Sequence, residues 1–145
     1  MRVKYKLRKV QKSDLDWLLT LRMETMAGYV RASGTLLTTE NQMARIEQDY
    51  ASIEIIRFED QDIGMIKLVK TPDFWKLIQI QILPEFQNCG IGQNLIKNIQ
   101  HQAGAQGIPI ALSVLRTNPA KRLYERLGFQ VTLEKEKSYQ MSYDV

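Results

Sequence analysis

The chain has 145 residues, of which 44% are hydrophobic and 25% are charged, a composition typical of a folded globular protein and not of a disordered one. A chain of this length predicts one domain that spans residues 1–145. Twenty Lys and Arg residues against 16 Asp and Glu residues leave a net charge of +4. Nucleic-acid-binding proteins usually concentrate positive charge more strongly, so we expect no nucleic acid among the partners.

Two scarce residue types exclude several kinds of site. Cys89 is the only cysteine, so the chain cannot form an internal disulfide, which favours a cytoplasmic location. His101 is the only histidine, so neither a Cys/His zinc cluster nor a Ser-His-Asp triad can be built, and we expect no metal. No apolar run approaches the ~20 residues of a membrane span, so no membrane partner is expected either.

The first fifty residues are predicted to form one strand and two helices. Alternating basic and apolar residues indicate a strand at Val3–Val10 with its basic side chains in solvent. Ser13 with Asp16 resembles a capping box that begins a helix, and Thr39–Gln42 shows the same pattern before a second, short helix. The apolar stripe of the first helix indicates a core-facing side, and only Arg22 interrupts it.

The remainder of the chain predicts a β-meander followed by alternating helices and strands. The meander is expected at Ile53–Phe58, Ile63–Lys70 and Phe74–Leu83. Helices are expected at Ile91–Ala105 and Pro119–Leu127, and further strands at Pro109–Leu115, Phe129–Leu133 and Ser138–Tyr143. The pattern therefore predicts an α/β fold with one mixed sheet.

The loop Gln87–Gln93 joins a strand to a helix and has the features of an anion site. Gly90 and Gly92 let main-chain N–H groups approach a ligand, and the N-terminus of the next helix adds unpaired amides and partial positive charge. A phosphate or pyrophosphate fits there, although two glycines also suit a simple tight turn. The loop lacks the third glycine and downstream acid of a dinucleotide site, and the Gly-Lys-Ser/Thr of a P-loop.

Two motifs together resemble the GNAT superfamily of acetyl-CoA-dependent N-acetyltransferases. One is the Gln-x-x-Gly-x-Gly of Gln87–Gly92 after Ile-x-Ile-Leu-Pro-Glu, and the other is Asn-Pro-Ala followed by Leu-Tyr-Glu-Arg-Leu-Gly-Phe, ending at Phe129. The resemblance implies a mixed, mostly antiparallel central sheet flanked by helices, with a splayed pair of central strands. No family motif occurs in Met1–Ser52, where such enzymes usually build their acceptor pocket. The acceptor therefore stays open between a small-molecule amine and a peptide amine.

The resemblance also implies which residues bind acetyl-CoA. Main-chain amides of the loop would hold the pyrophosphate, and the side chain of Gln87 would add a contact. Free main-chain groups at Ile80 and Ile82 would pair with the pantetheine arm like an added strand, and an N–H there could stabilise the oxyanion of the reacting thioester. The implied cofactor-binding residues are Ile80, Ile82, Gln87, Asn88, Cys89, Gly90, Ile91, Gly92, Gln93 and Asn118. A helix cap alone would also explain Asn118, which lies one residue closer to Tyr124 than in many relatives.

Tyr124 matches the family tyrosine that protonates the departing coenzyme A sulfur, which makes it the implied catalytic residue. A phenol with a pKa near ~10 donates to a thiolate whose thiol has a pKa near ~8.5 only with local help. The alternative is a packed helix tyrosine, because Leu123 and Leu127 mark a buried stripe.

The strand before the loop departs from the family pattern. Lys76 stands where the superfamily often carries a catalytic glutamate, so no general base is evident; Lys76 is either a solvated edge residue or a contact for an acidic acceptor group. Gln79 and Gln81 either orient a water that carries the substrate proton or pair with buried backbone groups. Cys89 is either loop filler or a reactive thiol at a helix N-terminus.

Two functions follow from these residues. The first is an N-acetyltransferase that transfers the acetyl group of acetyl-CoA directly to a primary amine, with Tyr124 as general acid. The second is a coenzyme A-binding sensor or partner-binding module that keeps the cofactor loop without turnover, suggested by Lys76 at the usual base position. Pairing through the C-terminal segment Ser138–Val145 would make a homodimer.

Overall fold

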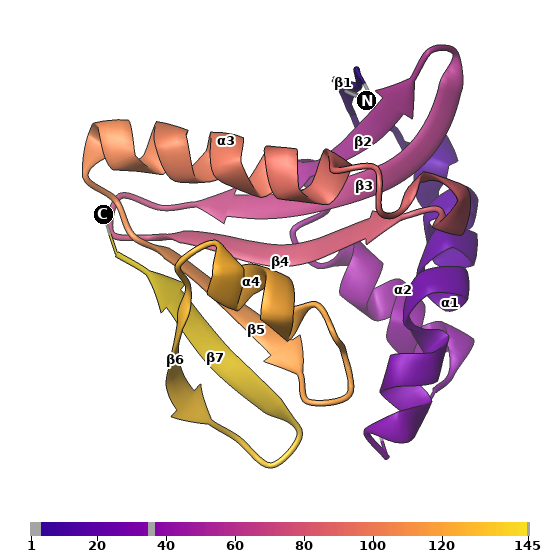
Figure 1. Cartoon of the computed structure of the whole chain (residues 1–145). Coiled ribbons are helices and arrows are strands. Elements are labelled where there is room, and N and C mark those ends of the chain that lie inside the picture. Colours follow the sequence, from indigo (N-terminus) through magenta and orange to yellow (C-terminus); the bar gives the residue numbers. More distant parts are fainter. Residues whose placement is uncertain (1–3, 35–36, 145) are drawn as a thin grey trace.

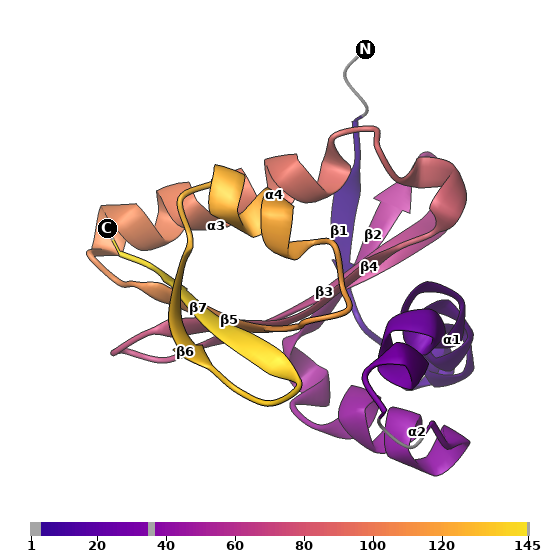
Figure 2. The same cartoon turned by 60° about the horizontal axis from the view of Figure 1, so that its bottom comes forward.

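The structure, a computed structural model, describes residues 4–34 and 37–144 as one seven-stranded sheet with helices on both faces (Figure 1). The strand order is β1-β2-β3-β4-β5-β7-β6. The strands are β1 (Lys6–Lys9), β2 (Ile53–Phe58), β3 (Gln61–Lys70), β4 (Trp75–Ile82), β5 (Ile110–Leu115), β6 (Gln130–Glu134) and β7 (Ser138–Tyr143). The helices are α1 (Leu15–Ala32), α2 (Thr39–Glu47), α3 (Ile91–Gln106) and α4 (Lys121–Arg126). Figure 2 shows α3 and α4 on one face of the sheet and α1 and α2 on the other.

The predicted fold class is confirmed. The meander β2–β3–β4 is antiparallel, and β4–β5 is the one parallel pair among the described strands. The strand β7 lies between β5 and β6, so the C-terminal strand is not an edge that could pair with a second copy; the edges of the described sheet are β1 and β6. Val145 lies outside the described residues. None of the helices in the described ranges combines the length and apolar character that a membrane crossing needs.

Both N-terminal helices begin at caps that differ from the predicted ones. The side chain of Asp14, and not that of Ser13, accepts from the main-chain N–H of Gln11 at 2.7 Å, within a 3₁₀ turn that precedes α1. At α2 the cap is Thr38, whose hydroxyl accepts from the N–H of Asn41 at 3.0 Å. At α1 the predicted box is absent, because the Asp14 bond closes the preceding 3₁₀ turn and no side chain of the described residues caps the helix; at α2 the cap lies one residue earlier than predicted.

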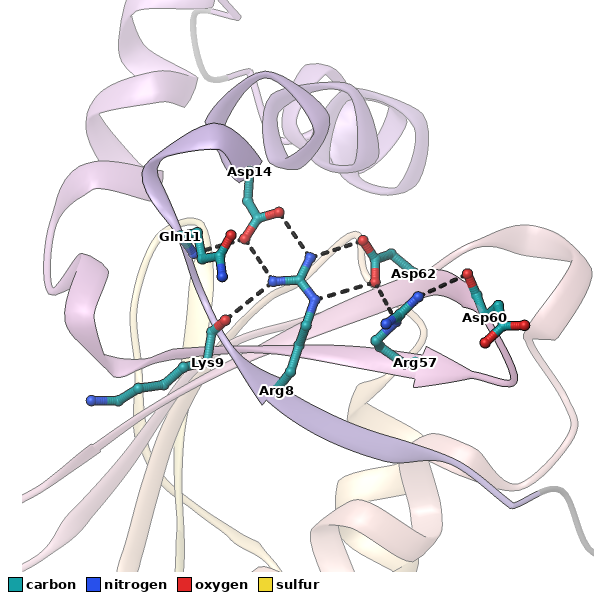
Figure 3. A network of polar contacts seen from close by, with 7 residues as sticks. All are labelled: Arg8, Lys9, Gln11, Asp14, Arg57, Asp60 and Asp62. Carbon is teal, nitrogen blue, oxygen red and sulfur yellow. Dashed lines mark hydrogen bonds and ion pairs between the residues drawn. The ribbon is translucent and has the colours of Figure 1, made fainter.

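An ion-pair network joins β1 to the turn before α1 and to the strands β2 and β3 (Figure 3). Arg8 was expected to face solvent, but its guanidinium donates to both oxygens of Asp14, at 2.9 and 2.8 Å. It also contacts Asp62 at 2.8 Å, and Asp62 pairs with Arg57 at 2.9 Å. These contacts link residues that are up to 54 positions apart in sequence. Arg8 therefore connects β1 with the turn before α1 and with β3.

Removing the charge of Asp14 should destabilise the fold. The Arg8 guanidinium lowers the pKa of Asp14, so the contribution of this carboxylate is fully present above the unfolded value of about 3.9 and is lost as the pH falls through the lower folded-state pKa. We expect Asp14→Asn to cost about 1–3 kcal/mol in urea unfolding near pH 7. The difference from the wild type should shrink below about pH 3. Asp16→Asn, at an exposed position in the same helical turn, is the control; an equal loss there would contradict this assignment.

A bulge in β4 decides which side chains face which helices. Gln79 pairs with Lys67 of β3 and Leu77 with Leu68, so Ile78 is an extra residue in β4. Before the bulge, Leu77 packs with the cluster that contains α3; after it, Gln79 reaches the opposite side and donates to a main-chain carbonyl of α2. The bulge therefore inverts the strand's alternation, which places the polar glutamines toward α1 and α2.

The close approach of β3 to β4 depends on Gly64. A Cβ atom at this position would overlap with the carbonyl oxygen of Gln81 and would lie 3.2 Å from the Cα of Ile82. Only glycine fits such a backbone contact. Gly64 thus fixes the end of β4 from which the chain leads into the loop Gln87–Gln93.

Candidate active site

The strands β4 and β5 separate soon after they meet. They pair only from Trp75 to Leu77 and from Ile110 to Leu112, and beyond that the two strands diverge. The gap forms a cleft of about 480 Å³. Its described lining consists of Arg22, Met26, Val30, Arg45, Gln48, Lys67, Lys76, Leu77, Ile78, Gln79, Ile80, Gln81, Leu112, Ser113, Val114, Leu115, Asn118, Tyr124, Lys137 and Ser138. The splayed central strands implied by the GNAT resemblance are therefore present.

Main-chain groups of β4 point into this gap. The N–H of Leu83 donates to the carbonyl of Ile63 in β3 at 2.8 Å. Because main-chain groups alternate along an antiparallel strand, those of Ile80 and Ile82 point away from β3, toward the side that β5 has left. The side chain of Gln87 donates to the Ile82 carbonyl at 2.8 Å. The Ile80 groups thus remain open, whereas Gln87 ties the loop back to the end of β4.

The loop itself has the geometry of an anion cradle. Asn88 and Gly90 both adopt the left-handed conformation, with φ of 62° and 84°, and Gly90 caps α3. The N–H of Asn94 donates to the carbonyl of Gly90, which leaves the amides of the first helical turn without partners inside the helix. Such amides at the positive end of a 16-residue helix suit a phosphate group.

The remaining loop residues have clearly different surroundings. Ile91 is 2% exposed and packs in the core beneath the helix, so only its main chain is available to a ligand. A Cβ at Gly92 would make only an ordinary contact with Ile82, at 3.6 Å, so neither the packing on β4 nor the backbone conformation requires glycine there. Cys89 and Gln93 are exposed, and the Cys89 sulfur lies 3.6 Å from the carbonyl of Gln87.

Tyr124 is a buried core residue that also lines the cleft. Its ring is buried, and it packs edge-on against Phe129 with 5.8 Å between ring centres. The residue also lines the cleft, and none of the hydrogen bonds found among the described residues uses its hydroxyl. Burial raises the pKa of Tyr124 to about 12. The surroundings therefore keep the phenol protonated, and they do not supply the pKa-lowering help that we expected from its role as an acid.

Asn118 lies at the same end of the cleft as Tyr124. Its side-chain oxygen accepts from the N–H of Ala120 at 2.9 Å and so closes a turn ahead of α4, whose N-cap is Ala120 and not Asn118 as predicted; Asn118 also lines the cleft. The helix α4 begins at Lys121, two positions after the expected start at Pro119. A turn in which the N–H of Arg122 donates to the Pro119 carbonyl precedes it.

The β4 glutamines lie in the wall of the cleft, and no carboxylate or histidine occurs among its described lining residues. The Gln79 amide nitrogen donates to the Arg45 carbonyl at 3.2 Å, while its side-chain oxygen is buried and has no partner. Gln81 is 5% exposed beside it. Lys76 is exposed at the cleft edge. His101 and the described acidic side chains do not form any cluster able to hold a metal ion.

Sequence reasoning missed Lys67, which is fully buried in β3 and lines the cleft. Its ammonium donates to the last carbonyls of α2, at Arg45 (2.8 Å), Ile46 (3.0 Å) and Gln48 (2.5 Å). Burial lowers the pKa of Lys67 to about 8, a shift that Asp49 opposes and Arg22 reinforces. In the sequence Lys67 looks like one more polar residue of a half-buried strand, and nothing there indicates the helix end that it meets.

Comparison with known proteins decides the family. Residues 49–131 match the family model described as acetyltransferase (GNAT) domain, which is more than half of the chain. The chain belongs to the GNAT acetyltransferase family. Over 81 residues it is 33% identical to a [ribosomal protein bS18]-alanine N-acetyltransferase of Haemophilus influenzae. That match covers 55% of each protein, so the chain spans about half the length of this curated relative.

Solved structures agree on the fold over nearly the whole chain. The protein PH1933 from Pyrococcus horikoshii superposes with a TM-score of 0.77 at 19% identity, covering 98% of this chain and 99% of that one. The PaiA N-acetyltransferase of Thermoplasma acidophilum, solved in complex with coenzyme A, superposes with a TM-score of 0.69 at 20% identity and the same coverage. The GNAT fold of this chain thus extends well beyond residues 49–131.

Proposed function

We propose that this GNAT protein is an N-acetyltransferase that transfers the acetyl group of acetyl-CoA directly to a primary amine. The observation that carries the proposal is the cleft between β4 and β5, which is lined by Ile80, with its open main-chain groups, and by Tyr124. The loop Gln87–Gln93 at the head of α3 lies outside this lining, beyond the end of β4. Acetyl-CoA supplies the activated thioester, and it matches these features because it combines a pyrophosphate with an extended, amide-containing arm.

Different groups of the chain would bind different parts of the coenzyme. The amides of Gln87–Gln93 would hold the pyrophosphate, since they lie at the head of α3. The open main-chain groups of Ile80 would pair with the pantetheine amides, in the way that an added strand pairs with an open sheet edge. The carbonyl of Ile82 is already bonded to Gln87, so we expect its N–H alone to be available on this side.

Tyr124 would complete the transfer as a proton donor. The amine nitrogen forms a bond to the acetyl carbon, the carbon–sulfur bond breaks, and the proton of the Tyr124 hydroxyl moves to the departing sulfur. The raised pKa keeps Tyr124 protonated but makes it a weaker acid, so the transfer depends on the negative charge that develops on the sulfur and on the groups around the bound coenzyme. The proton released by the amine passes to water, and water returns a proton to the Tyr124 phenolate, which restores the starting state.

The alternative, a coenzyme A-binding sensor without turnover, is favoured by one observation: the described cleft lining offers no carboxylate or histidine as a base. Product assays separate the two functions. Steady release of free coenzyme A thiol with an amine present supports the enzyme, whereas coenzyme binding without acetylation of any amine in a broad panel supports the sensor.

Thermal unfolding with acetyl-CoA, coenzyme A, NAD or ATP tests the cradle without knowledge of the acceptor. A ligand at about 100 times its dissociation constant adds about 2.7 kcal/mol to the free energy of unfolding, so the midpoint should rise by several degrees. We expect this rise with acetyl-CoA and coenzyme A only. The absence of a rise with both would contradict the proposed function, and an equal rise with ATP would indicate a general nucleotide site.

A further inference from the structure

The wall of the cleft formed by α1, α2, β3 and β4 is positively charged. Arg22, Arg45, Lys67 and Lys76 come from these four elements, and Lys137 joins them from the turn before β7. No Asp or Glu occurs among the described residues that line the cleft. None of the ion pairs found in the described chain involves any of the five cations.

Arg22 is a buried residue of this wall, and a hydrogen bond holds it in one orientation. It is 6% exposed, and its Nε donates to the side-chain oxygen of Gln42 at 2.6 Å. Gln42 is itself 1% exposed, so the orientation of the guanidinium is fixed. No hydrogen bond or ion pair among the described residues uses the two terminal nitrogens of Arg22, and neither is among the fully buried atoms without a partner. Arg22 lines the cleft, so these nitrogens are the part of its side chain available to a ligand there.

The positive charges repel one another across this space. Burial, reinforced by the charge of Arg45, lowers the pKa of Arg22 to about 10, which still leaves it protonated at neutral pH. The charge of Arg22 also disfavours the protonated form of Lys67 and so helps to lower its pKa. Asp49 acts on Lys67 from outside the cleft lining but does not pair with either arginine. An unpaired, partly desolvated cluster of this kind is costly, and a bound anion would relieve the cost.

The coenzyme does not account for these cations. Its phosphates belong at the loop after β4, to which none of the five residues belongs, and its pantetheine arm carries no charge. An arginine whose two terminal nitrogens are free presents the fork that binds a carboxylate or phosphate through two parallel hydrogen bonds. Lys76, at the cleft edge, adds long-range attraction.

We infer that the acceptor is a primary amine that also carries an anionic group, a carboxylate or a phosphate, which the free end of Arg22 binds. This inference rests on the proposed acetyltransferase function. It disfavours polyamines and other polycationic amines, which the same wall would repel.

Matched amine pairs test the inference. The release of coenzyme A thiol is measured at saturating acetyl-CoA for amino acids against their carboxamides and for O-phosphoethanolamine against ethanolamine. Each pair is compared at equal concentration of free amine. We expect kcat/KM to favour the anionic member by at least about tenfold, and the preference to fall as salt screens the charges. The two kinds of pair distinguish a carboxylate from a phosphate as the bound group.

Substitutions test which residues produce the preference for anionic amines. Arg22→Gln should bring the ratio within each pair close to one, and Arg22→Lys should restore part of it, because lysine keeps the charge but not the fork. Arg22 is buried, so Lys76→Gln at an exposed position provides a second test that spares the fold, with an expected several-fold loss of preference. Arg31→Gln, exposed on α1 and outside the cleft lining, is the control and should keep the wild-type ratio.

Each possible failure has a distinct signature. If calorimetry detects no binding of acetyl-CoA, the proposed function fails, and the acceptor inference fails with it. If acetyl-CoA binds and neutral or cationic amines react as well as anionic ones, only the acceptor inference is overturned. Coenzyme binding without turnover of any anionic amine also overturns it and favours the sensor.

Discussion

Replacing Tyr124 with phenylalanine should lower kcat by about 100-fold or more, the usual contribution of a positioned general acid. The ring would keep its buried packing against Phe129, and only the hydroxyl that faces the cleft would be lost. Acetyl-CoA affinity should therefore change little, so that kcat and kcat/KM fall together. Steady-state kinetics with calorimetry of acetyl-CoA binding would measure both quantities.

The neighbouring Tyr143 provides a matched control. Its ring packs on the same Phe129, with 5.5 Å between ring centres, but it does not line the cleft. Tyr143→Phe should leave kcat near the wild-type value.

Since the pKa of Tyr124 is about 12, wild-type kcat should show no loss from Tyr124 ionisation up to about pH 10. A Tyr124→Phe rate that equals the wild-type rate across this range would remove Tyr124 from the acid role.

The loop and the strands that flank it could be predicted from sequence because their signals are local. Gly90 requires a left-handed backbone, which glycine adopts readily, and the structure gives it that conformation at the head of α3. The strand predicted at Ser138–Tyr143 is confirmed with the same bounds, and the one predicted at Phe74–Leu83 differs by one residue at each end. Alternation of apolar residues within one strand carries that information.

The charged side of the cleft was not predictable in the same way. Arg22 stood out in the sequence as an interruption of an apolar stripe, but its partner Gln42 lies 20 residues away on another helix. The bulge at Ile78, which turns Gln79 toward the cleft, arises from how β4 pairs with β3, and no glycine or proline marks it in the sequence. Sequence reasoning thus supplied the residues proposed for the coenzyme and missed most of the charged wall of the cleft, which tertiary contacts assemble.

Lys67 offers the largest expected effect on stability. Its ammonium caps three carbonyls at the end of α2. In Lys67→Met the side chain keeps much of its volume and loses every donor; the carbonyl of Arg45 still accepts from Gln79, but those of Ile46 and Gln48 lose their only partners among the described contacts. Each buried group left without a partner costs about 1–3 kcal/mol. We therefore expect a loss of about 2–5 kcal/mol in urea unfolding.

Substitution of Lys70 on the same strand is the control that separates the loss of the α2 cap from the loss of one positive charge. Lys70 ends β3, is exposed, and stands over the ring of Trp75 at 4.6 Å. Lys70→Met should cost at most about 1 kcal/mol, the value of an exposed cation–π contact. Hydrogen exchange should show the loss in Lys67→Met first at the C-terminal end of α2, because that turn loses its cap. Equal destabilisation of the two variants, or unchanged exchange in α2, would show that α2 does not depend on the buried ammonium of Lys67.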